Sequence, residues 1–354
     1  MGKKPVHKPQ ITLKKSVLPF VSVCTPTFNR RPFIPYLIKC FQQQTYPKDR
    51  MEWIIVDDGS DPVGEFFKDI PQARYFYEPQ RMVLGRKRNF MHDKCKGDII
   101  VYMDDDDYYP PERVEHAVSR LQQSPGYLVA GSSEMHIFFT DIQKLFQVGP
   151  YGPNHATAAT FAFRKELLQR SRYDDTKALA EESQFLQQYS YPMIQLDTRK
   201  TILVFSHCHN TFDKRTMLQN MEGTKTKPSP LSVDDFMSKE ATELREFYTQ
   251  NINAALTPYE AGRPENKPEA MKQIELLKKE REDKQKALEE NQVIQSMQQQ
   301  LNQHLQNATA AHQKQLEEKN RLIAELLKKV KDLTAEVAEL KKNSFIEVTY
   351  QQQT

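Results

Sequence analysis

Four consecutive aspartates occupy positions 104–107, directly after the apolar residues 99–103. Carboxylates crowded at one strand end repel one another and raise each other's pKa, so a chain that keeps such a cluster usually holds a cation there. Proteins commonly bind Mg²⁺ or Mn²⁺ through one or two carboxylates together with substrate phosphates. The alternative is an acidic turn that caps the helix introduced by Pro110 and Pro111. The residue types alone leave both interpretations open.

Two more polar clusters follow apolar runs in the first part of the chain. Residues 25–30 follow the run 20–24, and residues 57–60 follow the run 53–56. Each cluster alone is ordinary turn chemistry. In an open parallel sheet, however, ligands bind at the carboxyl ends of the strands, near a switch in strand order. The three clusters are therefore predicted to converge on one site.

The elements that must position these clusters are short apolar runs alternating with helical segments. Continuous apolar strands of this kind indicate an α/β fold, Rossmann-like, with a mainly parallel sheet covered by helices on both faces. The expected strands are residues 20–24, 53–56, 73–77 and 98–103, and the helices between and after them are 34–44, 85–96 and 111–123. Beyond these we expect antiparallel strands at 127–136 and 137–148, a strand running into a helix at 161–169, a helix at 181–188, a last strand at 201–206 and a short helix at 233–250.

The composition changes sharply near residue 269. Residues 269–343 contain no Gly, Pro or Trp and show apolar residues spaced by three and four, as at Ile323, Leu326, Val330 and Leu333. Sustained heptads argue for a coiled coil that joins two or three copies of the chain, although a helical hairpin within one chain is an alternative. The expected organisation is a basic flexible tail (1–18), a globular α/β domain (19–222), a linker with a short helix (223–268), the coiled coil (269–343) and a tail (344–354).

Charge and cysteine content exclude several classes of protein. A net charge of +3 is too small to indicate nucleic acid as the main partner. The four cysteines are widely spaced and form no CxxC pair, so neither disulfides nor a zinc site are expected. No stretch approaches the 18 apolar residues typical of a transmembrane helix. The expected location is the cytoplasm.

Four sequence blocks, in this order and spacing, resemble a family 2 glycosyltransferase with the GT-A fold. They are residues 21–30 (VSVCTPTFNR), 54–60 (IIVDDGS), 85–89 (GRKRN) and 102–107 (YMDDDD). The resemblance covers residues 19–215 and implies an inverting, hexosyltransferase-type enzyme that uses a nucleotide sugar, usually a UDP-sugar, and Mn²⁺ or Mg²⁺. Sequences with a long helical tail of this kind are also similar to those of giant DNA viruses, which would place the protein in the host cytoplasm.

The resemblance assigns donor-binding roles to residues near the first two strands. The turn from Pro26 to Arg30 would frame the nucleotide, with Phe28 against the base. Asp58 would accept a hydrogen bond from a base N–H, for which a carboxylate is a strong acceptor. Arg86 and Arg88 would lie near the diphosphate, where a guanidinium matches phosphate oxygens. A solvated basic helix end is the alternative for this pair.

The aspartate cluster corresponds to the DxD-type metal motif of the family. Asp106 is the first choice of metal ligand, and Asp104 is its partner toward ribose or metal. Asp105, on the nucleotide side, leaves the register of the motif open by one residue. His207 and His209 alternate after the last strand and so share a face. Either could complete the metal shell or contact the diphosphate, and a packing role is equally open.

An inverting transfer also needs a carboxylate base. The family places it in a Glu-Asp pair on a helix downstream of the metal motif, and Glu181-Glu182 occupies that place, which makes Glu182 the candidate. A Glu here is longer than the family's Asp and would have to retract. The alternative is that both glutamates stabilise a helix start through its dipole.

Two other functions compete with the transferase. One is a coiled-coil scaffold that carries an inactive transferase domain. The other is a sugar nucleotidyltransferase, which is disfavoured because residues 24–30 lack its usual Gly-rich loop. The acceptor, whether glycan, protein or lipid, is not indicated by the sequence.

Overall fold

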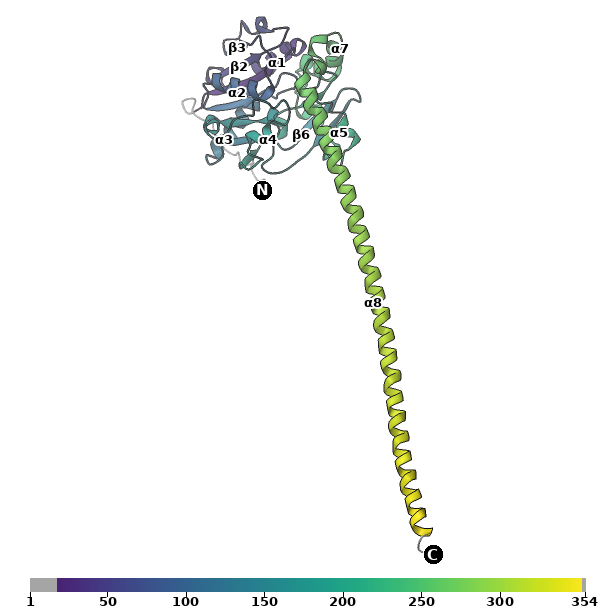
Figure 1. Ribbon diagram of the computed structural model, residues 1–354. Helices are drawn as coiled ribbons and strands as arrows, with labels where there is room; N and C mark the ends of the chain where they lie inside the picture. The colour runs from purple at the N-terminus through teal and green to yellow at the C-terminus, as the bar shows by residue number, and fades with distance from the viewer. Residues whose placement is uncertain (1–17, 352–354) are drawn as a thin grey trace, which may run out of the picture. The chain divides into compact units, whose positions relative to one another are not determined.

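The computed structural model describes residues 18–351 of the chain, with side chains described up to residue 342. They divide into two compact units, one that ends at Leu276 and one that begins at Leu277 (Figure 1). Nearly all of the expected basic tail (1–18) lies outside the described residues, as do the last three residues of the expected tail 344–354.

The first unit is built on a seven-stranded sheet with the order β3-β2-β1-β4-β8-β5-β9. β8 is antiparallel to both of its neighbours, and the other neighbouring pairs are parallel. The chain passes outward from β1 to β2 and β3 and then returns to β4 on the other side of β1, so the strand order switches between β1 and β4. The strands are β1 (Val21–Thr27), β2 (Met51–Asp57), β3 (Ala73–Tyr77), β4 (Ile99–Tyr102), β5 (Val129–Gly131), β8 (Ala162–Arg164) and β9 (Met193–Gln195).

Hydrophobic cores cover both faces of this sheet. β2 is buried along its whole length, and its residues alternate between the two cores, with Trp53 in one and Ile54 in the other. Helices α1 (Ile34–Gln42) and α3 (Arg113–Gln123) pack in the core of Trp53, whereas α2 (Leu84–Lys94) packs in the core of Ile54. This two-sided burial explains why the strands are apolar runs without alternation, as a covered parallel sheet requires.

A second sheet has the order β10-β6-β7-β11. Its strands are β6 (Met135–Phe139), β7 (Lys144–Val148), β10 (Val204–Ser206) and β11 (Thr226–Pro228). The single strand expected at 127–136 is therefore wrong, because the chain leaves the large sheet after Gly131 and enters the small one at Met135. The break is stabilised by the Ser132 N–H, which donates to Thr160 Oγ1 at 3.0 Å. The strand at 204–206 is also not the last one, since β11 follows it.

Two expected helices are shorter or more broken than the sequence indicated. α4 spans only Glu182–Phe185, because Gln187, Gln188 and Tyr189 have φ angles of 48°, 57° and 59° that no α-helix accommodates. The helix expected at 233–250 is a 3₁₀ turn (Val233–Asp235) followed by α6 (Thr242–Glu246), a π-helical turn (Phe247–Asn251) and α7 (Ile252–Leu256). A short α5 (Thr216–Gln219) precedes them.

The segment expected as a linker belongs to the first unit. Phe236, Met237, Tyr248 and Leu256 are at most 5% exposed and join the same core as Trp53. A free linker would leave such large apolar side chains in water, so residues 223–268 stabilise the fold of the first unit by burial.

A long helix, as predicted, forms the C-terminal part of the chain: α8 (Pro268–Gln351). It runs beyond the expected boundary at residue 343 into the expected tail. Its heptad residues are exposed, with Leu326, Val330 and Leu333 at 61%, 59% and 58%. Among the described residues, no helix is both long and apolar enough to cross a membrane.

Candidate active site

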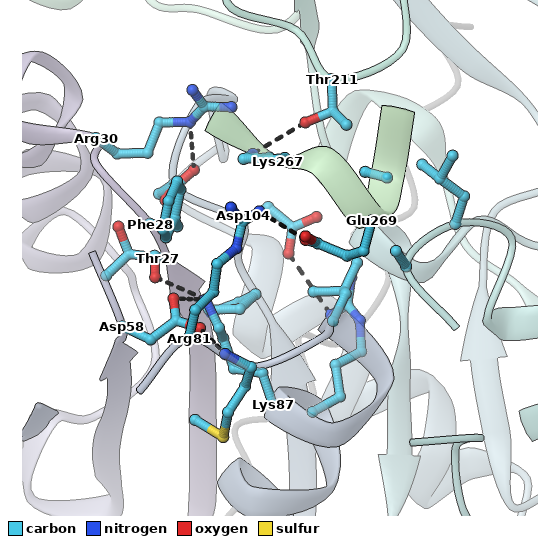
Figure 2. A pocket seen from close by; sticks show the side chains of 18 of the residues that line it. Thr27, Phe28, Arg30, Asp58, Arg81, Lys87, Asp104, Thr211, Lys267 and Glu269 are labelled. Carbon is cyan, nitrogen blue, oxygen red and sulfur yellow. Dashed lines mark hydrogen bonds and ion pairs between the residues drawn. The ribbon is translucent and has the colours of Figure 1, made fainter. Parts of the chain in front are cut away.

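A cavity of about 190 Å³ lies at the carboxyl ends of β1, β2 and β4, at the switch in strand order. All three polar clusters line it, together with the start of α2 and residues from much later in the chain (Figure 2). Of the site residues expected from the sequence, the lining contains Pro26, Phe28, Arg30, Asp58, Arg88, Asp104, Asp105 and Asp106. Arg86, Glu182, His207 and His209 are not among the lining residues.

Asp58 is held on both oxygens at the inner end of this cavity. Its Oδ2 accepts from the Met82 N–H at 2.6 Å, and its Oδ1 forms an ion pair with Lys87. The Lys87 ammonium also donates to the Thr27 carbonyl at 2.9 Å. Since both side chains are buried, the ammonium balances a carboxylate that would otherwise be costly to bury.

α2 therefore places Lys87, and not Arg86, beside Asp58 in the cavity. Arg86 is exposed to solvent and does not line the cavity. Adjacent residues on a helix point in different directions, and α2 begins at Leu84, which turns Lys87 and Arg88 inward. The block GRKRN indicates that cations lie near the site. The sequence does not reveal where α2 begins, and this decides which of the three cations face the cavity.

Phe28 lies under a guanidinium. The Arg81 guanidinium stands 4.2 Å from the centre of the Phe28 ring, within the range of a cation–π contact. Arg81 is itself held by Glu269, whose Oε1 accepts from Arg81 Nη2 at 2.6 Å. Arg81 was not expected from the sequence, and a base stacking on Phe28 would share the ring with it.

The aspartates differ in their partners. Arg30 is close to two of them, with Nε 3.5 Å from Asp105 Oδ1 and Nη2 3.4 Å from Asp106 Oδ2. Asp104 Oδ1 lies 3.7 Å from Arg88 Nη1 and is a buried oxygen without a hydrogen-bond partner. Asp107 supports the turn, since its Oδ1 accepts from the Phe205 N–H at 3.2 Å.

Their protonation follows these contacts. Burial raises the pKa of Asp104, and it raises the pKa of Asp105 to about 6. Burial acts in the same direction on Asp106, but the hydrogen bond with His207 and the charge of Arg30 outweigh it and lower the pKa of Asp106. Asp106 is thus the carboxylate of the cluster that stays ionised most firmly.

The two histidines contact different members of this group: His207 lies beside Asp106, and His209 lies beside Arg30. His207 Nε2 is 3.3 Å from Asp106 Oδ2, and burial lowers the pKa of His207 to about 4, which keeps the ring neutral at neutral pH. The His209 carbonyl accepts from Arg30 Nη2 at 3.1 Å, and its ring Nδ1 is buried without a hydrogen-bond partner. His207 is therefore the histidine beside the aspartates, and His209 reaches them only through Arg30.

These residues fit a divalent cation that takes most of its ligands from a substrate. Among the residues with described side chains, no group of three or more His, Cys, Asp or Glu is arranged to hold a metal ion. Asp106 and the neutral His207 offer an oxygen and a nitrogen side by side, and Asp104 offers an oxygen that lacks a hydrogen bond. Mg²⁺ and Mn²⁺ sites built from one or two protein ligands and phosphate oxygens are common.

Glu181 and Glu182 have separate surroundings at the start of α4. Glu181 is buried, and its Oε1 accepts from Arg88 Nε at 2.8 Å. Burial, followed by the charge of Glu181, raises the pKa of Glu182 to about 7. Arg88 thus joins Glu181 to Asp104, and Glu182 is the carboxyl of the pair whose protonation changes near neutral pH.

Four further lining residues lie far along the chain from the three clusters: Thr211, Lys267, Glu269 and Ala270. Lys267 Nζ donates to Thr211 Oγ1 at 2.9 Å (Figure 2). No local pattern marks them, because the Pro-rich stretch around Lys267 is typical of a connector.

Comparisons with known proteins match the first half of the chain. A protein-family model described as glycosyl transferase family 2 matches residues 22–179. The chain is 30% identical over 124 residues to glycosyltransferase AglE of Haloferax volcanii, which covers 34% of this chain and 41% of AglE. It is 32% identical over 128 residues to the GalNAc(5)-diNAcBac-PP-undecaprenol beta-1,3-glucosyltransferase of Campylobacter jejuni, covering 34% of this chain and 38% of that protein. The matched region thus spans about two fifths of these relatives.

One similar solved structure is the mannosyltransferase PcManGT from Pyrobaculum calidifontis in complex with GDP-Man and Mn²⁺. Its TM-score is 0.43 and its sequence identity 16%, over 72% of this chain and 77% of that one.

The matched region begins in β1 and contains all three strand-end clusters and α2. The α/β class expected from the sequence, with a mainly parallel sheet covered on both faces and followed by a long helix, is confirmed. Residues 22–179 are therefore similar to glycosyl transferase family 2.

Proposed function

We propose that this protein is a metal-dependent, inverting glycosyltransferase that moves a sugar from a UDP-sugar to an acceptor hydroxyl. The observation that carries the proposal is the cavity at the strand switch, where cationic side chains and four aspartates meet, most of them in the region that matches glycosyl transferase family 2. A nucleotide sugar needs this combination, because its diphosphate attracts cations whereas its base and ribose need hydrogen-bond acceptors.

The donor would lie along the cavity with its base near Phe28 and Asp58. Asp58 is buried and held in place by Lys87, so its oxygens are oriented to accept a hydrogen bond from a base N–H. Arg88, anchored by Glu181 and close to Asp104, would face the diphosphate. Asp106, with Asp104 or His207, would hold Mn²⁺ or Mg²⁺, which offsets the charge that develops on the departing phosphate.

Glu182 would act as the base. In an inverting transfer the acceptor oxygen attacks the anomeric carbon as Glu182 takes the hydroxyl proton, and the bond from that carbon to the diphosphate oxygen breaks, which releases UDP. A carboxyl with a pKa near 7 accepts a proton more readily than one with an ordinary value, and this favours Glu182 over the ion-paired Glu181.

The test is a screen of UDP, GDP and their sugars for thermal stabilisation and for hydrolysis, with and without Mn²⁺. Stabilisation by UDP that depends on Mn²⁺ would support the proposal. A chain that binds no nucleoside diphosphate in the presence of metal would instead fit a scaffold with an inactive transferase domain.

The rate of transfer is expected to rise with pH, with a midpoint near 7. Glu182 must be ionised to accept a proton, and its pKa is raised to about 7, so the base is lost as the pH falls through that value. The measurement is kcat/KM across neutral pH. The residual rate of Glu182→Gln should lack this inflection, and an inflection that persists in the variant would assign it to another group.

We further propose that α8 joins copies of the chain in a coiled coil through residues 277–342. Its heptad leucines and valines are exposed in the single chain, and pairing of such a stripe would remove them from water. A chain that ends at Leu276, where the first unit ends, is expected to show the mass of one copy by light scattering. Leu333→Lys in the full chain should dissociate the oligomer into single copies, whereas the substitution Lys331→Glu at a flanking position should leave the oligomer intact. An unchanged mass after truncation would refute the assignment.

A further inference from the structure

The donor cavity is covered by a segment that follows the last short helices of the first unit. Residues 259–270, called here the roof segment, connect α7 to the first turn of α8. Lys267, Glu269 and Ala270 from this segment line the same cavity as Asp58 and Asp104 (Figure 2). The roof segment lies well beyond the region that matches the family.

The roof segment is fixed by polar contacts along its length. The Tyr259 hydroxyl donates to Asp61 Oδ2 at 2.8 Å, and the carbonyls of Ala261 and Gly262 accept from Asn29 and Arg30 at 2.9 and 3.2 Å. At its other end Glu269 holds Arg81, and one turn later Gln273 Oε1 accepts from the Ala178 N–H at 2.9 Å. These contacts hold Lys267 in the cavity with a defined orientation.

Lys267 differs from the other cations that line the cavity. Arg30, Arg81, Lys87 and Arg88 each have a carboxylate within 4.0 Å. Lys267 Nζ donates to the neutral Thr211 hydroxyl, and among the residues with described side chains no carboxylate lies within 4.0 Å of it. Of the five cations that line the cavity in the described part of the chain, Lys267 therefore lacks a carboxylate in direct contact, although Asp105 and Asp106 act on it from farther away.

Lys267 is half-buried, and a cation without a carboxylate in contact is costly in such a place. Burying a charge without a counter-ion is unfavourable, and buried ammonium groups respond by losing their proton more easily. Burial, followed by the charge of Arg30, lowers the pKa of Lys267 to about 7, although Asp105 and Asp106 act in the opposite direction. A bound anion at this end of the cavity would remove the imbalance.

We propose that Lys267 binds the diphosphate of the donor from the roof segment, so that the donor site is completed by residues outside the family domain. The inference rests on the proposed function, since the anion it names is that of a nucleoside diphosphate. Thr211 orients the ammonium through its hydroxyl, and the contacts of Asn29, Arg30 and Arg81 hold the roof segment over the bound donor.

The test compares binding of UDP and uridine by calorimetry with Mn²⁺ present, in the full chain and in Lys267→Met. Methionine keeps the apolar stem and removes the charge, so UDP binding is expected to weaken roughly 10- to 100-fold, as for loss of a hydrogen bond to a charged group. Uridine lacks phosphates, and its affinity should not change. Lys267→Arg should restore most of the UDP affinity.

Lys272→Ala is the matched control, because Lys272 lies on the first turns of α8 but is exposed to solvent. It should leave both affinities unchanged. Equal losses for UDP and uridine in Lys267→Met would mean that the residue only shapes the roof, and unchanged or tighter UDP binding would overturn the proposal while the proposed function stands. Absence of UDP binding by the unaltered chain would overturn both.

Discussion

Asp106→Ala is expected to abolish Mn²⁺-dependent binding of UDP. Asp106 is the carboxylate of the cluster whose ionised form is most strongly favoured, and it stands beside both Arg30 and His207. Loss of outer-sphere partners of a metal weakens its binding roughly 10- to 100-fold, so loss of a direct ligand should cost at least about 100-fold. The measurement is the Kd of UDP by calorimetry with and without Mn²⁺.

The fold should survive this substitution. Arg30 keeps Asp105 and the carbonyls of His209 and Gly262 as partners, so no buried cation is stranded. Asp93→Ala, at an exposed position of α2, is the control and should bind UDP as the unaltered chain does. If Asp106→Ala kept the full effect of Mn²⁺, the metal ligand would have to be sought at Asp104 or Asp105.

Glu182→Gln is expected to leave UDP binding intact and to lower the transfer rate by roughly 10²- to 10⁴-fold, the usual contribution of a general base. The amide keeps the size of the side chain but cannot accept the acceptor's proton. The measurement combines kcat for transfer with the Kd of UDP. Glu166→Gln, an exposed glutamate, should change neither.

The neighbouring Glu181 gives a contrasting result. Glu181→Gln removes the carboxylate that pairs with Arg88 Nε, so it should weaken UDP binding, because Arg88 would lose its orientation. Loss of UDP binding in Glu182→Gln, by contrast, would count against its role as base and would exchange the roles of the two glutamates.

The part of the site carried by β1, β2 and β4 could be predicted from the sequence for a simple reason. Buried parallel strands are apolar runs with polar residues at their ends, and the ends of adjacent parallel strands meet. Pro26, Asp58 and Asp104 each follow or end such a run, and they line one cavity. Strand boundaries alone therefore brought residues up to about 80 positions apart together.

Two kinds of site residue could not be predicted from the sequence: those selected by the direction in which a helix presents them, and those that come from distant segments of the chain. Arg86 and Lys87 are neighbours in a cationic block, and only the observed start of α2 decides which of them faces the cavity. Lys267 lies in a Pro-rich stretch that resembles a connector, and its place depends on contacts with Asn29 and Arg81 that have no sequence signature. The predicted helix at 181–188 is too long, because residues 187–189 adopt positive φ angles, and nothing in their residue types indicates this.

The roof segment also bears on where this chain can be joined to segments of its relatives. A fragment that ends at residue 179, where the match to the family model ends, would lack Glu182 and the roof segment. A chimaera joined there would combine the strand ends of one parent with the roof segment of the other. If Lys267 binds the donor as proposed, a segment exchanged between relatives to change donor preference would have to extend to Leu276, where the first unit ends.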